Sequence, residues 1–493
     1  MKTDTIAAIA TSLSDSGIGI IRISGEDAIE IADRILVLKN QKHLKDIKSH
    51  TIHYGYVKDY NPLEPDSLKS DSLEYVFLES DPLKEHQEKE EILDEIMVSL
   101  MKAPKSYTTE DTVEINCHGG VLILQKVLQS VLRAGARMAE PGEFTKRAFL
   151  NGRIDLSKAE AVMDVIHAQN DYALQSSVRQ LKGSVSEKIR GLRSKILYEI
   201  AFIESALDDP EHISLDGYTD RLSAVVKEIK GELKKLADSS ENGKIIKEGI
   251  RTVIVGKPNV GKSSLLNLLV GEEKAIVTDI AGTTRDTLEE NIRLNGISLH
   301  MIDTAGIRST EDVVEKIGVE KAKRSADDAD LIIYVVDSSV PLDHNDEEIL
   351  GMICNKKSII LLNKSDLNPV VTESMLEDRL SFASGSEKPV IIKTSTKDHS
   401  GIKQLEQTVE QLFFHGKLQL NEEIMITNMR HKEAIDDAIE SLTMVERSLA
   451  DQMPEDFYSI DLMSAYASLG KIIGEEVGED LLNEIFSKFC MGK

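Results

Sequence analysis

The chain lacks tryptophan and is poor in cysteine and aromatic residues, and each shortage excludes a class of protein. Phe and Tyr together make up 4% of the 493 residues, and there are three cysteines. A platform that stacks the bases of single-stranded RNA needs aromatic side chains, so none is expected. Cys117, Cys354 and Cys490 lie far apart, which indicates neither a disulfide framework nor a zinc site. This cysteine usage fits a reducing compartment.

Positive charge and long apolar runs are also scarce. Asp and Glu number 85 against 59 Lys and Arg, which gives a formal net charge of −26. This balance opposes nonspecific attraction to nucleic-acid backbones and anionic membranes, so any nucleic-acid contact must be local. No run approaches the roughly 18 apolar residues of a membrane span. We therefore expect a cytoplasmic protein without a membrane span.

Length and hydropathy predict a multidomain α+β protein. At about 150 residues per domain, the length favours three domains. Residues 1–152 alternate short β-like and helix-like runs, as an α+β domain does. Residues 153–248 and 416–493 are helical in pattern, whereas residues 249–415 alternate apolar β runs with helices. A parallel α/β domain is thus expected to interrupt a central α-helical domain.

One of the helical segments contains a long, regularly spaced stripe of apolar residues. Apolar residues recur at spacings of three and four from Leu174 to Leu207, and Pro210 follows. This spacing predicts a single long amphipathic helix that serves as a scaffold and ends near the proline. Residues 59–91 are rich in Pro, Asp, Ser, Glu and Lys, and they predict a solvated surface insertion to which no function is assigned.

A phosphate-binding pattern lies in the interrupting domain. Residues 256–263 read Gly-Lys-Pro-Asn-Val-Gly-Lys-Ser, after a β run and before a helix-like segment. In such a loop the backbone N–H groups surround the phosphates, Lys262 neutralises the β and γ oxygens, and Ser263 binds Mg²⁺. Asp303-Thr-Ala-Gly306 follows a later β run and places a carboxylate beside Mg²⁺. The pattern predicts an inserted P-loop G domain of Ras-like fold.

Asn363-Lys-Ser-Asp366 indicates which base is bound. The Asp366 carboxylate can accept hydrogen bonds from N1–H and the 2-amino group of guanine, and adenine offers neither. Because a buried carboxylate without donors is strongly penalised, such sites discriminate by roughly 10⁴. We therefore predict GTP as the substrate. Ser395, Thr396 and Lys397 are expected to contact the base, although Thr396 replaces the alanine usual in this loop.

Water activation must differ from that of many GTPases. Ile307 follows Gly306 where many GTPases have a glutamine that orients the attacking water, and an apolar side chain cannot do this. Asn259 and residues 278–286 offer oxygens for a monovalent cation near the developing charge; an ordinary switch loop is the equal alternative. The Mg²⁺ ligands are predicted to be Ser263 and Thr284. The predicted GTP-binding residues are Asn259, Val260, Gly261, Lys262, Ser263, Ser264, Thr278, Asp279, Ile280, Ala281, Gly282, Thr283, Thr284, Asp303, Thr304, Ala305, Gly306, Asn363, Lys364, Asp366, Ser395, Thr396 and Lys397.

Three further segments are far more specific than the nucleotide motifs. They are Arg22-Ile-Ser-Gly25, the run Pro-Gly-Glu-Phe-Thr-Lys-Arg-Ala-Phe-Leu-Asn-Gly-Arg at 141–153, and the terminal Phe-Cys-Met-Gly-Lys at 489–493. With these segments the chain closely resembles the MnmE (TrmE) family of tRNA-modification GTPases over nearly its whole length. The resemblance implies a homodimeric, K⁺-stimulated GTPase that forms a heterotetramer with an FAD-dependent MnmG-type subunit. Together they would add an aminomethyl or carboxymethylaminomethyl group to C5 of the tRNA wobble uridine.

The resemblance also implies roles for single residues in hydrolysis. K⁺ would be bound by Asn259, Thr278, Ile280 and Thr283. Glu315, in Val-Val-Glu-Lys-Ile-Gly, would be the general base, acting through water. Taken alone, Glu315 is more simply interpreted as a solvated helix carboxylate.

In the N-terminal domain the resemblance implies a folate site. A reduced folate, 5-formyl- or methylene-tetrahydrofolate, would supply the one-carbon unit and bind Arg22, Glu114, Arg153 and Lys493. A pterin edge can donate to a carboxylate such as Glu114, and cations suit the glutamate tail. The N-terminal domain is thus expected to have a folate-binding-like α+β fold and to mediate dimerisation.

Two positions and two alternative functions stay open. Cys490 is either a small buried apolar residue or a redox or catalytic thiol, and Thr109 stands where the family usually has glycine. The main alternative is a non-modifying regulatory GTPase switch in ribosome assembly or signalling, which would need neither the N-terminal segments nor the tail. A plain folate-binding aminomethyltransferase would leave the GTP motifs unexplained. The sequence does not indicate whether glycine or ammonium is the amine donor.

Overall fold

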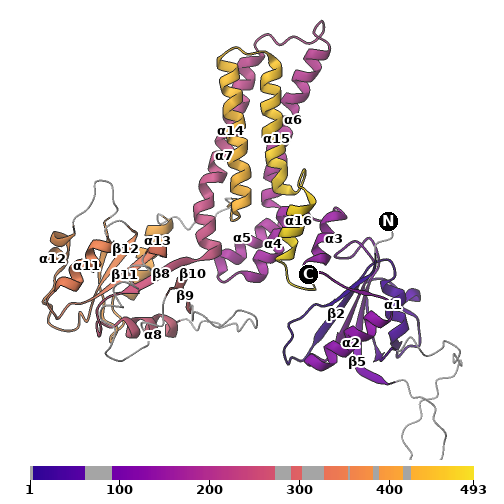
Figure 1. The fold of residues 1–493 in the computed structure, drawn as a ribbon, viewed down its shortest axis with the longest axis horizontal. Helices are drawn as coiled ribbons and strands as arrows, with labels where there is room; N and C mark the ends of the chain where they lie inside the picture. Colours follow the sequence, from indigo (N-terminus) through magenta and orange to yellow (C-terminus); the bar gives the residue numbers. More distant parts are fainter. Residues whose placement is uncertain are drawn as a thin grey trace, which may run out of the picture. The chain divides into compact units, whose positions relative to one another are not determined.

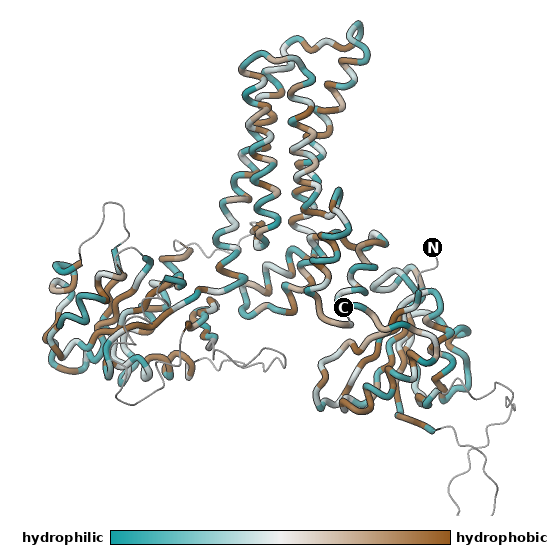
Figure 2. Tube along the Cα trace, in the orientation of Figure 1, coloured by the Kyte–Doolittle hydropathy of each residue, from teal (hydrophilic) through white to brown (hydrophobic). Residues whose placement is uncertain are grey.

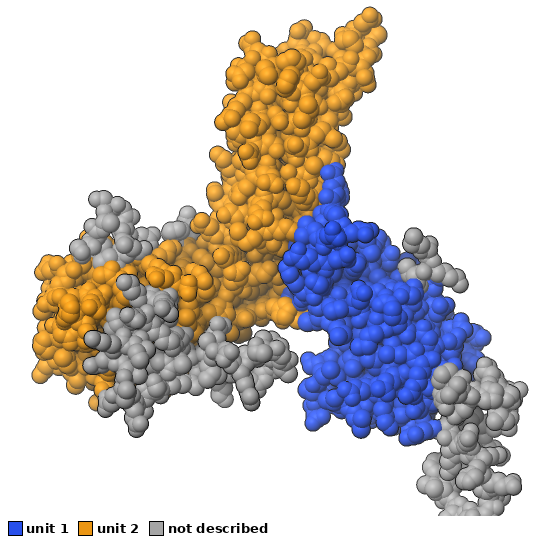
Figure 3. Space-filling model, in the orientation of Figure 1, with its two compact units in different colours: residues 1–163, 473–493 blue, residues 164–472 orange. Residues whose placement is uncertain are grey.

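The computed structural model describes residues 4–60, 91–272, 290–302, 327–353, 356–380, 388–414 and 424–492. The chain divides into two compact units (Figure 3). Residues 1–163 with 473–493 form the first unit, and residues 164–472 form the second. Each unit contains its own β-sheet.

A mainly antiparallel sheet forms the centre of the first unit. Among the described residues, seven strands lie in the order β3-β4-β5-β6-β2-β1-β7. Neighbouring strands are antiparallel except β1 and β7, which are parallel. The strands are β1 (Ile6–Ile9), β2 (Gly19–Ser24), β3 (Leu36–Leu38), β4 (Thr51–Lys58), β5 (Ile92–Met101), β6 (Thr112–Cys117) and β7 (Arg137–Met138). The helical elements are α1 (Ala28–Ile35), η1 (Leu44–Asp46), α2 (Val121–Arg133), α3 (Glu143–Leu150), α16 (Glu479–Ser487) and α4 (Leu156–His167), which continues into the second unit.

Helices α1 and α2 cover one face of this sheet (Figure 1). Their buried residues Ile31 and Val127 join a hydrophobic cluster that contains Ile21 and Ile23 of β2. Because side chains alternate across a strand, Arg22 points to the opposite face. The sheet therefore has one packed face and a second face that carries polar residues.

Four long helices make up most of the helical part of the second unit. They are α6 (Ser184–Asp208), α7 (Tyr218–Glu248), α14 (Met429–Ala450) and α15 (Glu455–Ile473), and the shorter α5 (Asp171–Lys182) precedes them. Figure 1 shows α7 beside α14 and α6 beside α15. Polar contacts join both pairs: Lys230 donates to Glu446 at 2.6 Å, and Ser459 donates to Glu204 at 3.1 Å. Among these helices and the rest of the described chain, none is both long and apolar enough to cross a membrane.

The prediction of one helix from Leu174 to Leu207 is wrong. The helix is interrupted at Gly183, where α5 ends and α6 begins. Gly183 has a φ of 108°, a conformation that glycine adopts readily and that commonly ends helices. The apolar stripe continues across the break, so periodicity alone does not reveal it. Helix α6 ends at Asp208, which confirms the end expected near Pro210.

A second sheet forms the rest of the second unit. Among the described residues, six strands lie in the order β13-β12-β11-β8-β10-β9. All neighbours are parallel except β9 and β10. The strands are β8 (Ile250–Val255), β9 (Glu290–Leu294), β10 (Ile297–Met301), β11 (Leu331–Asp337), β12 (Ser358–Asn363) and β13 (Val390–Lys393). The helices are α8 (Lys262–Glu272), α11 (His344–Ile353), α12 (Glu373–Arg379) and α13 (Ile402–Phe414).

The central strands of this sheet are buried on both faces. In β11, Ile333 and Val335 belong to one hydrophobic cluster, whereas Ile332 and Tyr334 belong to another. Such strands read as continuous apolar runs, because helices cover both faces of a parallel sheet. Figure 2 shows these runs in brown. The parallel α/β arrangement that the sequence predicts for this part of the chain is present.

The antiparallel edge of the sheet is a feature that the sequence analysis missed. Asn295 and Gly296 connect β9 to β10 and have φ values of 48° and 78°. Positive φ at both turn positions is typical of a two-residue hairpin, and Asn-Gly is its commonest sequence signal. The signal was therefore present in the sequence.

Candidate functional site

The parallel strands of the second sheet bring the nucleotide motifs to one edge. The phosphate-binding loop follows β8, Asp337 ends β11, Asn363 ends β12 and Ser395 follows β13. Strand β11 lies between β8 and β12, and all three are parallel. Ligands of open α/β sheets bind at the carboxyl ends of the strands. The motifs therefore meet where a nucleotide is expected.

The phosphate-binding loop depends on residues in left-handed conformations. Gly256, Asn259 and Gly261 have φ values of 150°, 60° and 105°. A Cβ atom on Gly256 would clash with the carbonyl oxygen of Val335, and one on Gly261 would clash with Nδ2 of Asn363. Helix α8 begins at Lys262, so the unpaired N–H groups of its first turn lie beside the loop. This arrangement suits an anion.

The Lys262 ammonium group is held against the loop by neutral acceptors. Its Nζ atom donates to the carbonyl oxygens of Gly256 at 2.7 Å and of Lys257 at 2.6 Å. Burial lowers the pKa of Lys262. A phosphate would give this ammonium group a charged partner, and charge-assisted hydrogen bonds are about twice as strong as neutral ones.

Asn363 joins the base-binding motif to the phosphate-binding loop. Its side chain is buried, and Nδ2 donates to the carbonyl oxygen of Val260 at 2.7 Å. Its Oδ1 atom is buried and has no hydrogen-bond partner among the described residues. Since buried polar atoms are normally hydrogen-bonded, this oxygen can accept a hydrogen bond from a further donor.

Lys364 has a carboxylate partner that the sequence analysis missed. Its Nζ atom lies 2.6 Å from Oδ2 of Asp337, and Ser339 donates to Oδ1 through both N–H and hydroxyl. Burial raises the pKa of Asp337, but the hydrogen bonds from Lys364 and Ser339 outweigh burial and lower it. The available signal was that Asp337 directly follows a buried apolar run, as Asn363 does.

Asp366, which is predicted to contact the base, is exposed, whereas the sequence argument assumed a buried carboxylate. Its Oδ1 atom accepts a hydrogen bond of 2.9 Å from the hydroxyl of Ser395, which is fully buried. Ser395 Oγ also accepts from the Lys397 N–H at 3.3 Å. The two predicted base-contacting segments thus meet, and the carboxylate can be desolvated only when a ligand covers it.

The first unit brings together another predicted group of residues. Arg22 and Glu114 are direct cross-strand partners in β2 and β6, and Nε lies 2.8 Å from Oε1. The Nη1 atom of Arg22 donates to the carbonyl oxygen of Gly492 at 2.8 Å. The C-terminal segment therefore lies beside the polar face of the sheet.

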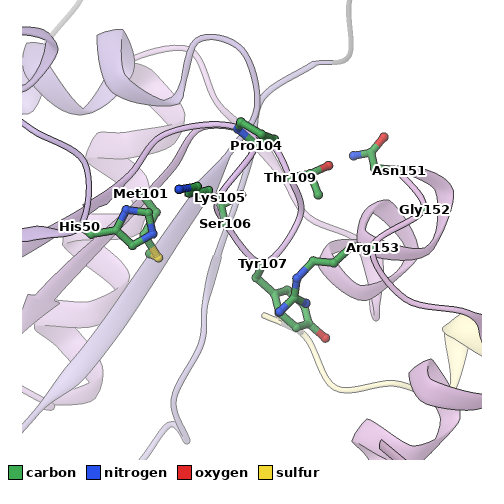
Figure 4. Close-up of a pocket in the computed structure, with 10 residues that line it drawn as sticks. All are labelled: His50, Met101, Pro104, Lys105, Ser106, Tyr107, Thr109, Asn151, Gly152 and Arg153. Carbon is green, nitrogen blue, oxygen red and sulfur yellow. The ribbon is translucent and has the colours of Figure 1, made fainter. Parts of the chain in front are cut away.

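Tyr107, which the sequence analysis did not select, lies between the two predicted arginines. The guanidinium carbon of Arg153 is 4.8 Å from the centre of its ring, and that of Arg22 is 6.0 Å away. Figure 4 shows Arg153 against this ring at the edge of a pocket of about 610 Å³. Residues 104–107 and 151–153, together with His50, Met101 and Thr109, line the pocket.

Comparisons with known proteins match nearly the whole chain. A model of the GTP-binding protein TrmE N-terminus matches residues 5–153, and a model of the MnmE helical domain matches residues 156–490. The tRNA modification GTPase MnmE of Lachnoclostridium phytofermentans is 56% identical over 495 residues, with 100% of both chains covered. The chain belongs to the MnmE family.

Two further matches were found. The tRNA modification GTPase MnmE of Acetivibrio thermocellus is 49% identical over 492 residues, again with 100% of both chains covered. Among solved structures, the G domain of the FeoB iron transporter of T. maritima aligns with 33% of this chain and 98% of its own, at 23% identity and a TM-score of 0.25.

Part of the MnmE motif set lies outside the described residues. The predicted positions concerned are Thr278, Asp279, Ile280, Ala281, Gly282, Thr283, Thr284, Asp303, Thr304, Ala305, Gly306, Ile307, Glu315 and Lys493, and Cys354 also falls there. Ser263 and Ser264 are described, and both lie exposed in the first turn of α8.

The structure describes two positions that the sequence analysis left open. Cys490 is exposed, so its interpretation as a small buried residue is wrong. Thr109, where glycine is usual, has a φ of 64°. This left-handed conformation is easier for glycine than for a β-branched residue.

Proposed function

We propose that the chain hydrolyses GTP to drive modification of C5 of the tRNA wobble uridine, with a reduced folate as the one-carbon source. As a member of the MnmE family it is a GTP hydrolase and a tRNA modification enzyme. One observation supports nucleotide binding by this chain. The second sheet brings four predicted residues together at one edge, namely Lys262, Asn363, Lys364 and Asp366. The proposed domains are residues 1–152 for folate binding and dimerisation, a G domain at 249–415, and a helical domain formed by 153–248 with 416–493.

Guanine specificity is assigned to Asp366 and its neighbours. An exposed carboxylate next to the buried Ser395 hydroxyl offers acceptors to a ligand that carries two adjacent N–H donors. The unpaired Oδ1 of Asn363 belongs to the first residue of the same motif, at the end of β12. Guanine supplies such donors, and a closed site without them leaves polar groups unpaired, which costs about 1–3 kcal/mol per group.

Replacing Asp366 by asparagine tests this assignment. Asp366→Asn exchanges an acceptor for a mixed donor and acceptor, so nucleotide preference should shift from guanine toward xanthine. Competition between GDP and xanthosine diphosphate for a fluorescent nucleotide measures the shift. Asp398→Asn removes the same charge from the neighbouring exposed loop and should leave the preference unchanged. Unchanged GDP affinity in Asp366→Asn would refute the assignment.

Hydrolysis is proposed to need Mg²⁺, K⁺ and Glu315. Ser263, with Thr284, suits Mg²⁺ because hydroxyl oxygens at this position of a P-loop bind that ion. Asn259 is an exposed residue of the phosphate-binding loop, and amide and carbonyl oxygens such as those of Asn259, Thr278, Ile280 and Thr283 suit K⁺. Ile307 cannot orient water, which supports Glu315 as the general base.

The hydrolysis proposal predicts a dependence on the monovalent cation. GTP turnover should be faster in K⁺ than in Na⁺ at equal ionic strength. Glu315→Ala should lower kcat while nucleotide affinity stays nearly constant, as expected for an interaction made only in the transition state. Glu373→Ala, at an exposed carboxylate of the same sheet domain, is the control. Equal rates in both salts, or full activity of Glu315→Ala, would contradict the scheme.

The chemistry of the first unit fits a reduced folate. Glu114 offers carboxylate oxygens, Arg22 and Arg153 offer guanidinium donors, and the Tyr107 ring lies between the arginines. A pterin presents amide and amino donors on one edge and a planar ring, while the glutamate tail is anionic. When bound, the folate would carry the one-carbon unit, and these residues would hold and orient it. Lys493 would join them, since Gly492 already accepts from Arg22.

The folate proposal predicts selective loss of binding. Glu114→Gln should weaken binding of 5-formyltetrahydrofolate about tenfold or more, because one carboxylate acceptor becomes a donor. Glu95→Gln makes the same change in an ion pair with Lys39 at 3.0 Å in the same sheet, and it should bind folate normally. Titration calorimetry measures both. Equal folate affinity in Glu114→Gln would exclude this carboxylate from the site.

Partners follow from the same family assignment. A homodimer is supported by the exposed apolar side chains of β4 and β5, among them Ile52, Tyr54 and Met97, of which Tyr54 and Met97 are cross-strand partners. We propose a cytoplasmic heterotetramer with an FAD-dependent MnmG-type subunit, acting on tRNA, with Cys490 as a redox or catalytic thiol. A non-modifying regulatory switch is disfavoured, because the full-length relatives are tRNA modification GTPases.

A further inference from the structure

A buried polar network lies directly behind the phosphate-binding loop. Asp346 of α11 is 1% exposed, yet it carries a carboxylate. Its Oδ1 atom accepts from the hydroxyl of Tyr334 at 2.7 Å, and its Oδ2 atom lies 2.7 Å from Nζ of Lys257. The backbone N–H of Asp343 also donates to Oδ2, at 2.9 Å. A buried carboxylate is tolerated only with partners of this kind.

The network joins two different elements, β11 and α11, to the loop. Tyr334 is fully buried in β11, and its register partner is Val255, the last residue of β8 before the loop. Asp346 lies in the first turn of α11, and Lys257 is the second residue of the phosphate-binding motif. The sheet and the helix therefore both hold the same short stretch of loop.

The backbone of Lys257 also accepts a hydrogen bond from Lys262, the lysine of the phosphate-binding motif. The ammonium group of Lys262 donates to the carbonyl oxygens of Gly256 and Lys257. Lys257, whose Nζ atom pairs with Asp346 and, at 2.9 Å, with Asp343, is thus the residue whose backbone accepts from Lys262. Displacement of Lys257 would move the acceptors of Lys262 and the loop N–H groups together.

We propose that Lys257, Asp346 and Tyr334 form a P-loop anchor that positions the loop for the β-phosphate of guanine nucleotides. These residues act through the loop and are positioning residues. A loop held in its binding conformation loses less freedom when the ligand binds, and this gain appears as affinity. The anchor should therefore contribute to binding of nucleotides with a β-phosphate, and much less to binding of the base.

Nucleotides of different phosphate number test the P-loop anchor in the full-length chain. In Asp346→Asn the GDP dissociation constant should rise about tenfold, whereas the GMP dissociation constant should change less than about twofold. The GDP-to-GMP affinity ratio therefore falls. Lys257→Met should do the same, and the Lys257→Met/Asp346→Asn double variant should be no weaker than either single variant. Lys257→Arg keeps the charge and should keep the ratio.

Two further variants separate positioning from stability. Tyr334→Phe keeps the core volume and removes one hydrogen bond to Asp346. This variant should fold, and its GDP-to-GMP affinity ratio should fall by a smaller factor than that of Asp346→Asn. Asp330→Asn breaks the exposed ion pair with Arg251 near the opposite ends of the same two strands, and the ratio should stay unchanged. If Asp346→Asn and Tyr334→Phe lower only the thermal unfolding midpoint and leave the GDP-to-GMP ratio unchanged, the proposal is overturned.

Discussion

The parallel pairing of β8, β11 and β12 is the constraint on which the nucleotide site depends. Because these strands run in the same direction and in register, the segments that follow them start at the same edge of the sheet. Asn363 then reaches the carbonyl oxygen of Val260, although the two residues are 103 positions apart in the chain. The strands are held by burial on both faces, so the core of the sheet fixes the geometry of a polar site at its edge.

In the first unit, the two-residue alternation of side chains along the strands places polar residues together on one face of the sheet. Alternation along β2 and β6 places Ile21, Ile23 and Ile115 in the hydrophobic cluster and leaves Arg22 and Glu114 on the opposite face. The ion pair there is mostly buried, with 19% and 21% of the two side chains exposed. The backbone of the C-terminal segment completes the group through Gly492.

Much of the nucleotide site was predictable, because each of its motifs follows an apolar run that reads as a buried strand. The P-loop, Asn363 and Asp366 were found in this way. Contacts between distant segments were not predictable: nothing local indicates that Asp337 meets Lys364, or that Asp346 meets Lys257. The exposure of Asp366 was also missed, since a sequence motif does not report how far a loop projects.

The errors in the fold have local causes. The break at Gly183 was missed because the apolar stripe continues in register across it, and a glycine inside a helical pattern does not by itself show a positive φ. The hairpin at Asn295 and Gly296 was missed although its signal was present. Hydrophobic periodicity indicates which residues are buried, whereas single residues such as glycine indicate where the backbone reverses. Prediction of the fold therefore needs both signals.

We propose that this chain couples its GTP site to modification of the tRNA wobble uridine. Mass spectrometry of tRNA nucleosides from cells that lack the chain, with and without complementation, tests it directly. The account predicts that the C5-substituted wobble uridine disappears, that the unaltered chain restores it, and that a Lys262→Ala chain does not. An unchanged wobble uridine in the deletion strain, or full restoration by Lys262→Ala, would contradict the account.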